Sequence, residues 1–261
     1  MYQRAARNTR GISTFVRGDT SPSASTDGSL SVAKRGPVAA IGLAMAFGLF
    51  GLTFRGSRAR FWERMTLTGF VLGNMALANE ADLRRLRFRE RDVALGLLSA
   101  AGLYAIFQVG DRTARAVMPS GAQEIGDIYA LRSLRPKSEI ATRLATVIGP
   151  AEELFWRGFV QRRLGAAGAA MAYGGAHLVT GNATLIGAAT VAGIYWGFLR
   201  AIGMSMPALI TSHVAWDIWI FLLAPTEPEP LPNAEVTAPV APPEPSPPPV
   251  VPARPRGRRA T

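Results

Sequence analysis

The chain contains no cysteine. Disulfides, thiolate nucleophiles and cysteine-ligated zinc sites are therefore excluded, and the redox compartment is left undetermined. Histidine is scarce as well: the chain has two, His177 and His213, and both fall in apolar segments. A histidine alone in such a segment is more simply a packed core residue than a ligand, so only its neighbours can indicate a function.

Acidic residues are also few, since 18 Asp and Glu face 29 Lys and Arg and give a net charge of +11. In a soluble protein this balance suggests nucleic acid. Here no platform of interleaved aromatic residues accompanies the basic clusters, so no nucleic-acid partner is expected. The arginines cluster at the ends of apolar runs, where they would meet anionic head groups, and the expected partners are membrane lipids. The two main clusters are Arg55, Arg58, Arg60, Arg64 and Arg84, Arg85, Arg87, Arg89, Arg91.

Both ends of the chain are polar. The first apolar run begins near Val38, which is too deep for an ordinary secretory signal peptide. Residues 1–35 are rich in Arg, Ser and Thr and are expected to form a disordered basic arm, with an organelle transit peptide as the alternative. Residues 225–261 are rich in proline and end in arginines, which predicts a disordered linker with a basic end.

Residues 36–224 read as one all-α, polytopic membrane helix bundle. Several apolar runs approach the roughly 20 residues that a spanning helix needs. Their content of Gly, Ala and Ser allows close helix packing in lipid. Six to eight transmembrane helices are predicted, with the orientation left open because basic residues flank both sides of the early segments. The main runs are 37–54, 66–78, 92–109, 138–164, 166–180, 183–202 and 204–224.

Two adjacent glutamates, Glu152 and Glu153, lie inside one of these runs. An ionised carboxylate in hydrocarbon costs roughly 3 kcal/mol or more. In a helix over 138–164, kinked at Pro150, Glu152 lies about 20 Å from the helix start. Such a depth predicts a functional role in the membrane.

Glu153 and Arg157 are four residues apart, so they share a helix face with the acid in the favourable N-terminal position. Glu152 points about 100° away, toward a different neighbour. It is then the less neutralised carboxylate and a candidate general base. Taken alone, this pattern also fits a buried structural ion pair.

The two histidines complete the pattern, because each has a polar residue four positions away. Tyr173 and His177 share one helix face, and His213 and Asp217 share another. Three such pairs in apolar helices favour a site over isolated packing residues.

The run Glu152-Glu153-Leu-Phe-Trp-Arg157-Gly resembles the EExxxR motif of the CPBP family, which comprises CAAX proteases and bacteriocin-processing enzymes and is also called the Abi family. The resemblance covers about residues 125–222. It includes the run Gly-Ile-Tyr-Trp-Gly-Phe-Leu-Arg and the Met-Pro-Ala-Leu-Ile approach to His213.

Two further motifs follow in the family's order. Tyr173-Gly-Gly-Ala-His177 is similar to its FxxxH motif, with Tyr in place of Phe, and His213-Val-Ala-Trp-Asp217 is similar to its HxxxN/D motif. Each motif is weak alone, whereas three in sequence on apolar helices are specific.

The resemblance implies an intramembrane glutamic-type, metal-independent endopeptidase acting on a membrane-proximal or lipid-modified protein or peptide, usually in a prokaryotic plasma membrane. No cofactor and no metal are expected. Glu152 with His177 would activate a water molecule, and Glu153 with Arg157 would orient the site. The implied catalytic set is Glu152, Glu153, Arg157, His177, His213 and Asp217.

His213 with Asp217 would stabilise the oxyanion. An ionised Asp217 cannot donate a hydrogen bond, so it would be protonated or would hold His213 in a donor tautomer. The hydroxyl that Tyr173 adds to the motif needs a partner, for which the site itself is a candidate.

Three other readings remain open. Glu152, His177, His213 and Asp217 could bind zinc in a membrane peptidase, although HExxH spacing is absent. A proton-coupled transporter could use the same groups, although no inverted repeat is evident. A non-catalytic scaffold or immunity protein could keep the fold and use its tails for contacts.

Overall fold

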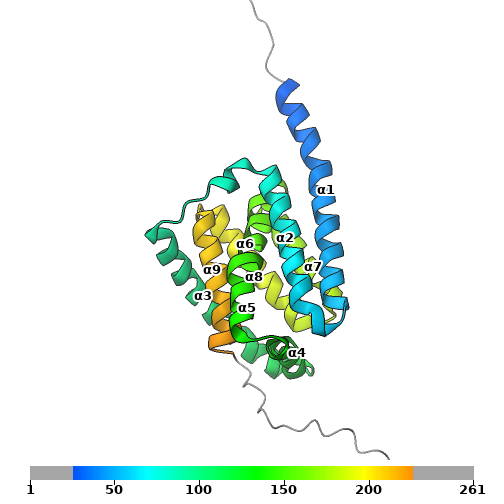
Figure 1. Ribbon diagram of the computed structural model, residues 1–261, viewed down its shortest axis with the longest axis vertical. Helices are drawn as coiled ribbons and strands as arrows, with labels where there is room; N and C mark the ends of the chain where they lie inside the picture. The colour runs from blue at the N-terminus through cyan, green and yellow to red at the C-terminus, as the bar shows by residue number, and fades with distance from the viewer. Residues whose placement is uncertain (1–25, 226–261) are drawn as a thin grey trace, which may run out of the picture. The chain divides into compact units, whose positions relative to one another are not determined.

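The computed structural model describes residues 26–225, with side chains described from Gly36 onward (Figure 1). Within that range the chain forms helices and turns and no strand. The predicted all-α class is thereby confirmed for the described part. The predicted disorder of residues 1–25 and of the tail from residue 226 lies outside the described residues.

Nine stretches of α-helix follow one another along the described chain. Their bounds are α1 Thr26–Arg55, α2 Phe61–Asn79, α3 Glu90–Val117, α4 Gly121–Tyr129, α5 Lys137–Arg143, α6 Gly149–Glu153, α7 Gln161–Ala176, α8 Ala183–Ala201 and α9 Met206–Ile218. Short π-helical turns at Leu144–Ile148 and Leu154–Val160 join α5, α6 and α7, and another at Trp219–Leu223 extends α9. Helix α1 begins at Thr26, inside the segment predicted as an arm and well before the predicted start at Pro37.

Three helices in the described range are long and apolar enough to cross a membrane: Gly36–Arg55, Glu90–Val117 and Met206–Leu223. Length and composition thus identify fewer spans in the described range than the six to eight that were predicted. The segment that carries the two glutamates is not among the three.

The break between two predicted runs lies at Gly165. This residue has a φ of 72° inside α7, a left-handed conformation that only glycine adopts without strain. The predicted boundary between 138–164 and 166–180 is therefore where the helix axis changes.

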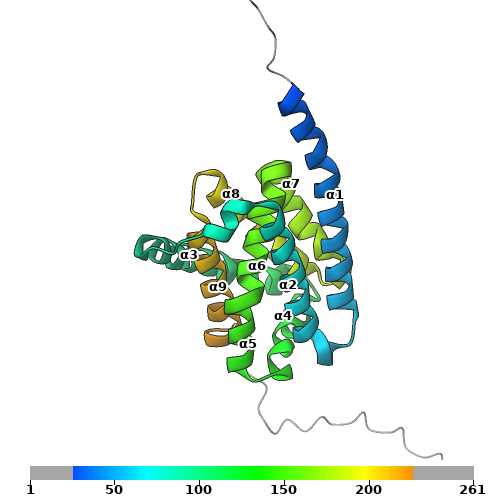
Figure 2. The same cartoon turned by 45° about the horizontal axis from the view of Figure 1, so that its top comes forward.

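Small residues set the distances between helices. Helices α1 and α2 lie side by side, as do α3 and α9 (Figure 1, Figure 2). A Cβ added at Gly96 of α3 would lie 2.7 Å from the carbonyl oxygen of Ala208 in α9, and one added at Gly73 of α2 would lie 2.9 Å from the Cβ of Ala151 in α6. Close backbone approach of this kind is how helices pack in lipid, where apolar burial provides little driving force.

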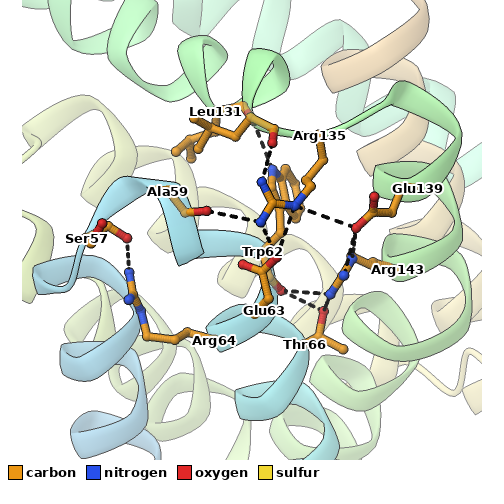
Figure 3. A network of polar contacts seen from close by, with 11 residues as sticks. Ser57, Ala59, Trp62, Glu63, Arg64, Thr66, Leu131, Arg135, Glu139 and Arg143 are labelled. Carbon is orange, nitrogen blue, oxygen red and sulfur yellow. Dashed lines mark hydrogen bonds and ion pairs between the residues drawn. The ribbon is translucent and has the colours of Figure 1, made fainter.

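A polar network fixes the start of α5 against α2 (Figure 3). Arg135 donates through Nε to Glu63 Oε1 at 3.0 Å. Arg143 donates through Nη2 to Glu139 Oε1 at 2.7 Å and through Nη1 to Thr66 Oγ1 at 2.9 Å. The continuous α5–α7 segment is thus anchored to α2 before it reaches the glutamates.

Candidate active site

The two glutamates end α6, immediately before the π-helical turn Leu154–Val160. Glu152 is 6% exposed and Glu153 is fully buried. Wide π-helical turns are rare and occur frequently at functional sites. Their presence beside two buried acids marks this segment as the centre of the candidate site.

Glu153 is a shared acceptor. Its Oε1 accepts a hydrogen bond from Nδ1 of His213 at 2.7 Å and lies 3.1 Å from Nη1 of Arg157. The predicted ion pair between Glu153 and Arg157 is confirmed. Both partners are buried, and either charge alone would be costly to desolvate. The opposite charges of the pair offset that cost for each other.

Arg157 is held by more than this carboxylate. Its Nη2 donates to the carbonyl oxygen of Ala192 at 3.4 Å. Its guanidinium carbon lies 4.9 Å from the centre of the Tyr173 ring and 5.2 Å from that of the Trp196 ring. Cation–π contact with both rings fixes the arginine in a dry setting.

Glu152 faces a different set of neighbours, as its position on the helix predicts. Its Oε2 accepts a hydrogen bond from the Tyr173 hydroxyl at 2.7 Å, which supplies the partner that this hydroxyl needs. The same oxygen lies 4.0 Å from Nε2 of His213. Glu152 thus connects α7 to α9.

His213 lies at the centre of three carboxylates. Its Nδ1 donates to Glu153, and its Nε2 lies 3.7 Å from Asp217 Oδ2 and 4.0 Å from Glu152 Oε2. The ring stacks on Trp196 with centroids 4.0 Å apart. Glu153, rather than Asp217, therefore makes the direct hydrogen bond that orients the imidazole, and Asp217 lies on the opposite, Nε2 side.

His177 is positioned through the backbone. Its Nδ1 donates to the carbonyl oxygen of Tyr173 at 2.9 Å, so the proton of the neutral ring lies on Nδ1. The ring packs against Phe50 and Phe54 of α1, at 5.1 Å and 5.7 Å between centroids. Among the described contacts, no hydrogen bond joins His177 to Glu152, and the predicted pairing of the two is indirect, through Tyr173.

Three supporting residues were not singled out from the sequence. Trp196 donates through Nε1 to Ser212 Oγ at 3.0 Å, and Ser212 is hydrogen-bonded to Ser99 of α3 at 3.0 Å. This buried chain fixes the indole on which His213 lies. Trp196 belongs to the family-like Gly-Ile-Tyr-Trp-Gly run and could have been found there, whereas nothing local pointed to Ser99.

In residues 26–225 no group of three or more His, Cys, Asp or Glu side chains is arranged to hold a metal ion. Several of the polar atoms that converge in this site are connected by the hydrogen bonds and the ion pair described above, whereas Oε2 of Glu153 has no hydrogen-bond partner among the described residues.

The sequence of residues 139–219 matches the model of a protein family described as "Type II CAAX prenyl endopeptidase Rce1-like". These residues form an Rce1-like family domain. The domain runs from α5 into the extension of α9 and contains all six predicted site residues. No curated protein and no solved structure matched the chain.

The family consists of CAAX prenyl endopeptidases, which are proteases of membranes, and the resemblance stated from the motifs is confirmed. The matched segment leaves α1 to α4 outside. Helices α1 and α3 nevertheless contribute Phe50 beside His177 and Ser99 beside Ser212.

Proposed function

We propose that this chain is an intramembrane endopeptidase that hydrolyses a peptide bond of a membrane-proximal or lipid-modified protein with a water molecule activated by Glu152. The proposal depends on three buried side chains that converge on one point. Nε2 of His213 lies 4.0 Å from Oε2 of Glu152 and 3.7 Å from Oδ2 of Asp217. Both distances are too long for a direct hydrogen bond and suit a bridging water or substrate oxygen. The family of the domain supports the reaction class.

In the proposed reaction, the carboxylate of Glu152 takes a proton from water while the water oxygen attacks the scissile carbonyl carbon. The Tyr173 hydroxyl, bound to Oε2, fixes the direction of this carboxylate. His177 acts on it from a distance by holding the carbonyl of Tyr173. When the tetrahedral intermediate collapses, the C–N bond breaks and the proton passes from Glu152 to the leaving amine.

His213 is the proposed donor to the oxyanion. When the ring carries a proton on Nε2 as well as Nδ1, the carboxylate of Glu153 at 2.7 Å stabilises its positive charge, as the buried acid does in serine protease triads. A donor of this kind is worth about 3 kcal/mol of transition-state stabilisation. Asp217 lies beside Nε2, and Arg157 holds Glu153 in place through the ion pair.

We further propose that the bundle lies in the membrane as a whole, with more spans than the three that length and composition identify. Large apolar side chains are exposed on helices outside that set, including Phe70 of α2, Met171 of α7 and Ile194 of α8. Since the chain has no cysteine, single cysteines at these positions can be probed without background. They should resist a membrane-impermeant thiol reagent in intact membranes and react after detergent extraction.

The function is tested by terminal-peptide mass spectrometry on membranes that contain either the wild-type chain or Glu152→Gln at equal abundance. The glutamine keeps an oxygen that can accept from Tyr173 but cannot take a proton from water. New protein termini should appear with the wild type and not with the variant. Glu90→Gln, on the exposed start of α3, is the matched control and should cleave like the wild type.

Identical terminus profiles for folded wild type and Glu152→Gln would overturn the protease assignment. Cleavage that disappears with a chelator and returns with added zinc would replace the proposed mechanism with a metallopeptidase one. Proton-linked flux in vesicles without cleavage would favour a transporter.

A further inference from the structure

A groove of about 760 Å³ lies beside α6, with Pro150 and Leu154 in its lining. Its walls come from α2, α3, α6, α9 and the π-helical turns beside α6, and from the connection between α2 and α3. The lining is almost entirely apolar and includes Leu77, Leu86, Phe88, Leu97, Pro150 and Val214. Arg84 is the charged member of this lining, and none of the six proposed site residues belongs to it.

The wall at Arg84 belongs to a strongly basic segment. Arg84, Arg85 and Arg87 are exposed, and of these three Arg84 lines the groove together with Leu86 and Phe88. Among the described residues, these three arginines take part in no ion pair. The groove therefore has a free cation on its wall at Arg84, with Arg85 and Arg87 beside it in the chain; these three arginines are called the cationic rim.

Two acids close in sequence, Glu80 and Asp82, are already paired, while Glu90 lies three residues after Arg87 at the start of α3. Arg162 lies 2.9 Å from Glu80 and 2.7 Å from Asp82, and Arg163 lies 2.6 Å from Glu80. Because these two carboxylates are paired to the α7 segment, they do not compensate the arginines at the rim.

The rim lies at one end of two candidate membrane spans. Helix α3 begins at Glu90, directly after the arginines, and α9 begins at Met206. Asp92 Oδ1 accepts a hydrogen bond from Ser205 Oγ at 2.5 Å, so the two helix starts meet. Arginines at the shared end of two spans mark the membrane–water boundary, and the groove extends from there along the apolar parts of the helices.

We propose that this groove binds an anionic phospholipid. Its phosphate would be held by Arg84, with the charges of Arg85 and Arg87 attracting it to the rim, and an acyl chain would lie against Leu97, Pro150 and the neighbouring apolar side chains. The chemistry on each part of the surface fits that ligand: a charge that recognises phosphate lies at the depth of head groups, and an apolar channel lies at the depth of chains.

The position of the groove gives the lipid a structural consequence. Pro150 and Leu154 line it and flank Glu152 and Glu153 in sequence, and Val214 lines it next to His213. A bound chain would therefore contact α6, the turn after it and α9 within two residues of the acids and the imidazole in sequence. Binding of a phospholipid in this groove does not depend on whether the chain cleaves peptides.

The test uses the purified full-length chain in neutral detergent, titrated with phosphatidylglycerol or phosphatidylcholine and read by native mass spectrometry and thermal unfolding. Phosphatidylglycerol should bind more tightly and raise the unfolding temperature more. Replacing Arg84, Arg85 and Arg87 by Gln should weaken its binding on the order of 100-fold, at about 1 kcal/mol per arginine near the head groups. Replacing Arg254, Arg256 and Arg258 by Gln removes the same charge elsewhere and should change binding little.

A second variant tests the chain-binding part. Ala145 lines the groove, and Ala145→Phe fills it while leaving the rim arginines intact. This variant should also weaken phosphatidylglycerol binding.

Equal affinity for both lipids, or equal affinity in the rim and tail variants, would overturn the proposal. Saturable binding of a lipid-modified peptide without binding of phospholipid would assign the groove to a substrate instead. Glu152→Gln should bind phosphatidylglycerol like the wild type, which separates this test from that of the proposed protease.

Discussion

At the scale of the residue, the site is a set of short-range pairs joined by longer-range contacts. The Glu153–Arg157 pair follows from spacing on one helix, and so does the relation of His177 to Tyr173. The hydrogen bond from Tyr173 to Glu152 crosses between helices, as does that from His213 to Glu153. Because the family motif has Phe where this chain has Tyr173, that first bond distinguishes this chain from the motif.

Tyr173→Phe tests the contribution of that hydroxyl. The phenyl ring should stay packed against Trp156, whose ring centre lies 5.3 Å away, so the fold should persist. Loss of a hydrogen bond to a charged group costs about 1.5–3 kcal/mol, which predicts a fall in cleavage rate of roughly 10- to 100-fold. Rates would be measured on a substrate identified by the terminus profiles.

The matched control is Tyr104→Phe, which removes a hydroxyl that donates to the carbonyl of Ala224 at 3.3 Å, away from the site. It should cleave at the wild-type rate. A Tyr173→Phe enzyme as fast as the wild type would show that Glu152 needs no help from the hydroxyl.

At the scale of the element, helix contacts rather than helix propensity set the architecture. Long apolar runs predicted most helices, because a hydrophobic segment has few other ways to satisfy its backbone in lipid. The π-helical turns around α6 could not be read from composition, since they arise where packing widens a helix. The close approach of α3 to α9 depends on Gly96, which has no side chain.

Gly96→Ala tests the approach of α3 to α9. The added Cβ would lie 2.6 Å from Cβ of Thr211 and 2.7 Å from the carbonyl oxygen of Ala208, so the helices must separate. The expected loss is about 1–3 kcal/mol of stability, measured by thermal unfolding in detergent. Gly110→Ala on the same helix meets nothing within 4 Å and should be neutral or slightly stabilising. Equal effects of the two substitutions would argue against a tight α3–α9 contact.

Glu124 connects α4 to the start of α8 and gives a pH-dependent contribution. The backbone N–H of Thr184, the hydroxyl of Ser120 and the hydroxyl of Thr184 donate to its carboxylate and hold the pKa of Glu124 below its usual range. A lowered folded-state pKa means that the stabilisation is fully present above about pH 4.3, the ordinary glutamate value, and is lost as the pH falls through the folded-state pKa.

Glu124→Gln should therefore cost about 1 kcal/mol at neutral pH, the difference between charged and neutral hydrogen bonds. The difference from the wild type should shrink as the pH is lowered below 4. Thermal unfolding of both chains across pH 3–7 would measure it. A constant difference over that range would mean that the carboxylate charge contributes nothing.

At the scale of the whole molecule, the family domain and the rest of the chain are interdependent. The domain at residues 139–219 contains the polar site residues, yet Phe50 of α1 packs on His177 and Ser99 of α3 is bonded to Ser212. The described helical bundle, rather than the matched segment alone, is thus the unit on which the site depends.

Removal of residues 1–25 and 226–261 together tests whether the described bundle is sufficient for the proposed activity. The six site residues and their described contacts lie within 36–225, so the shortened chain should cleave at the wild-type rate in the same membrane assay. Abundance would be matched by quantitative immunoblotting. A chain that loses its cellular effect on this truncation, yet keeps it with Glu152→Gln, would be the scaffold rather than the peptidase.

The sequence by itself determined the helical class, the basic boundaries of the apolar runs, the three residue pairs and the family of residues 139–219. Each of these follows from local spacing or from composition, which need no knowledge of the fold. Only the tertiary structure decided that Glu153 contacts both Arg157 and His213, that Tyr173 binds Glu152, and that a groove with Arg84 on its wall lies beside α6. Residues such as Glu153 and His213 are 60 positions apart, and their meeting depends on how α6 and α9 cross, which close packing at small residues sets and no local period encodes.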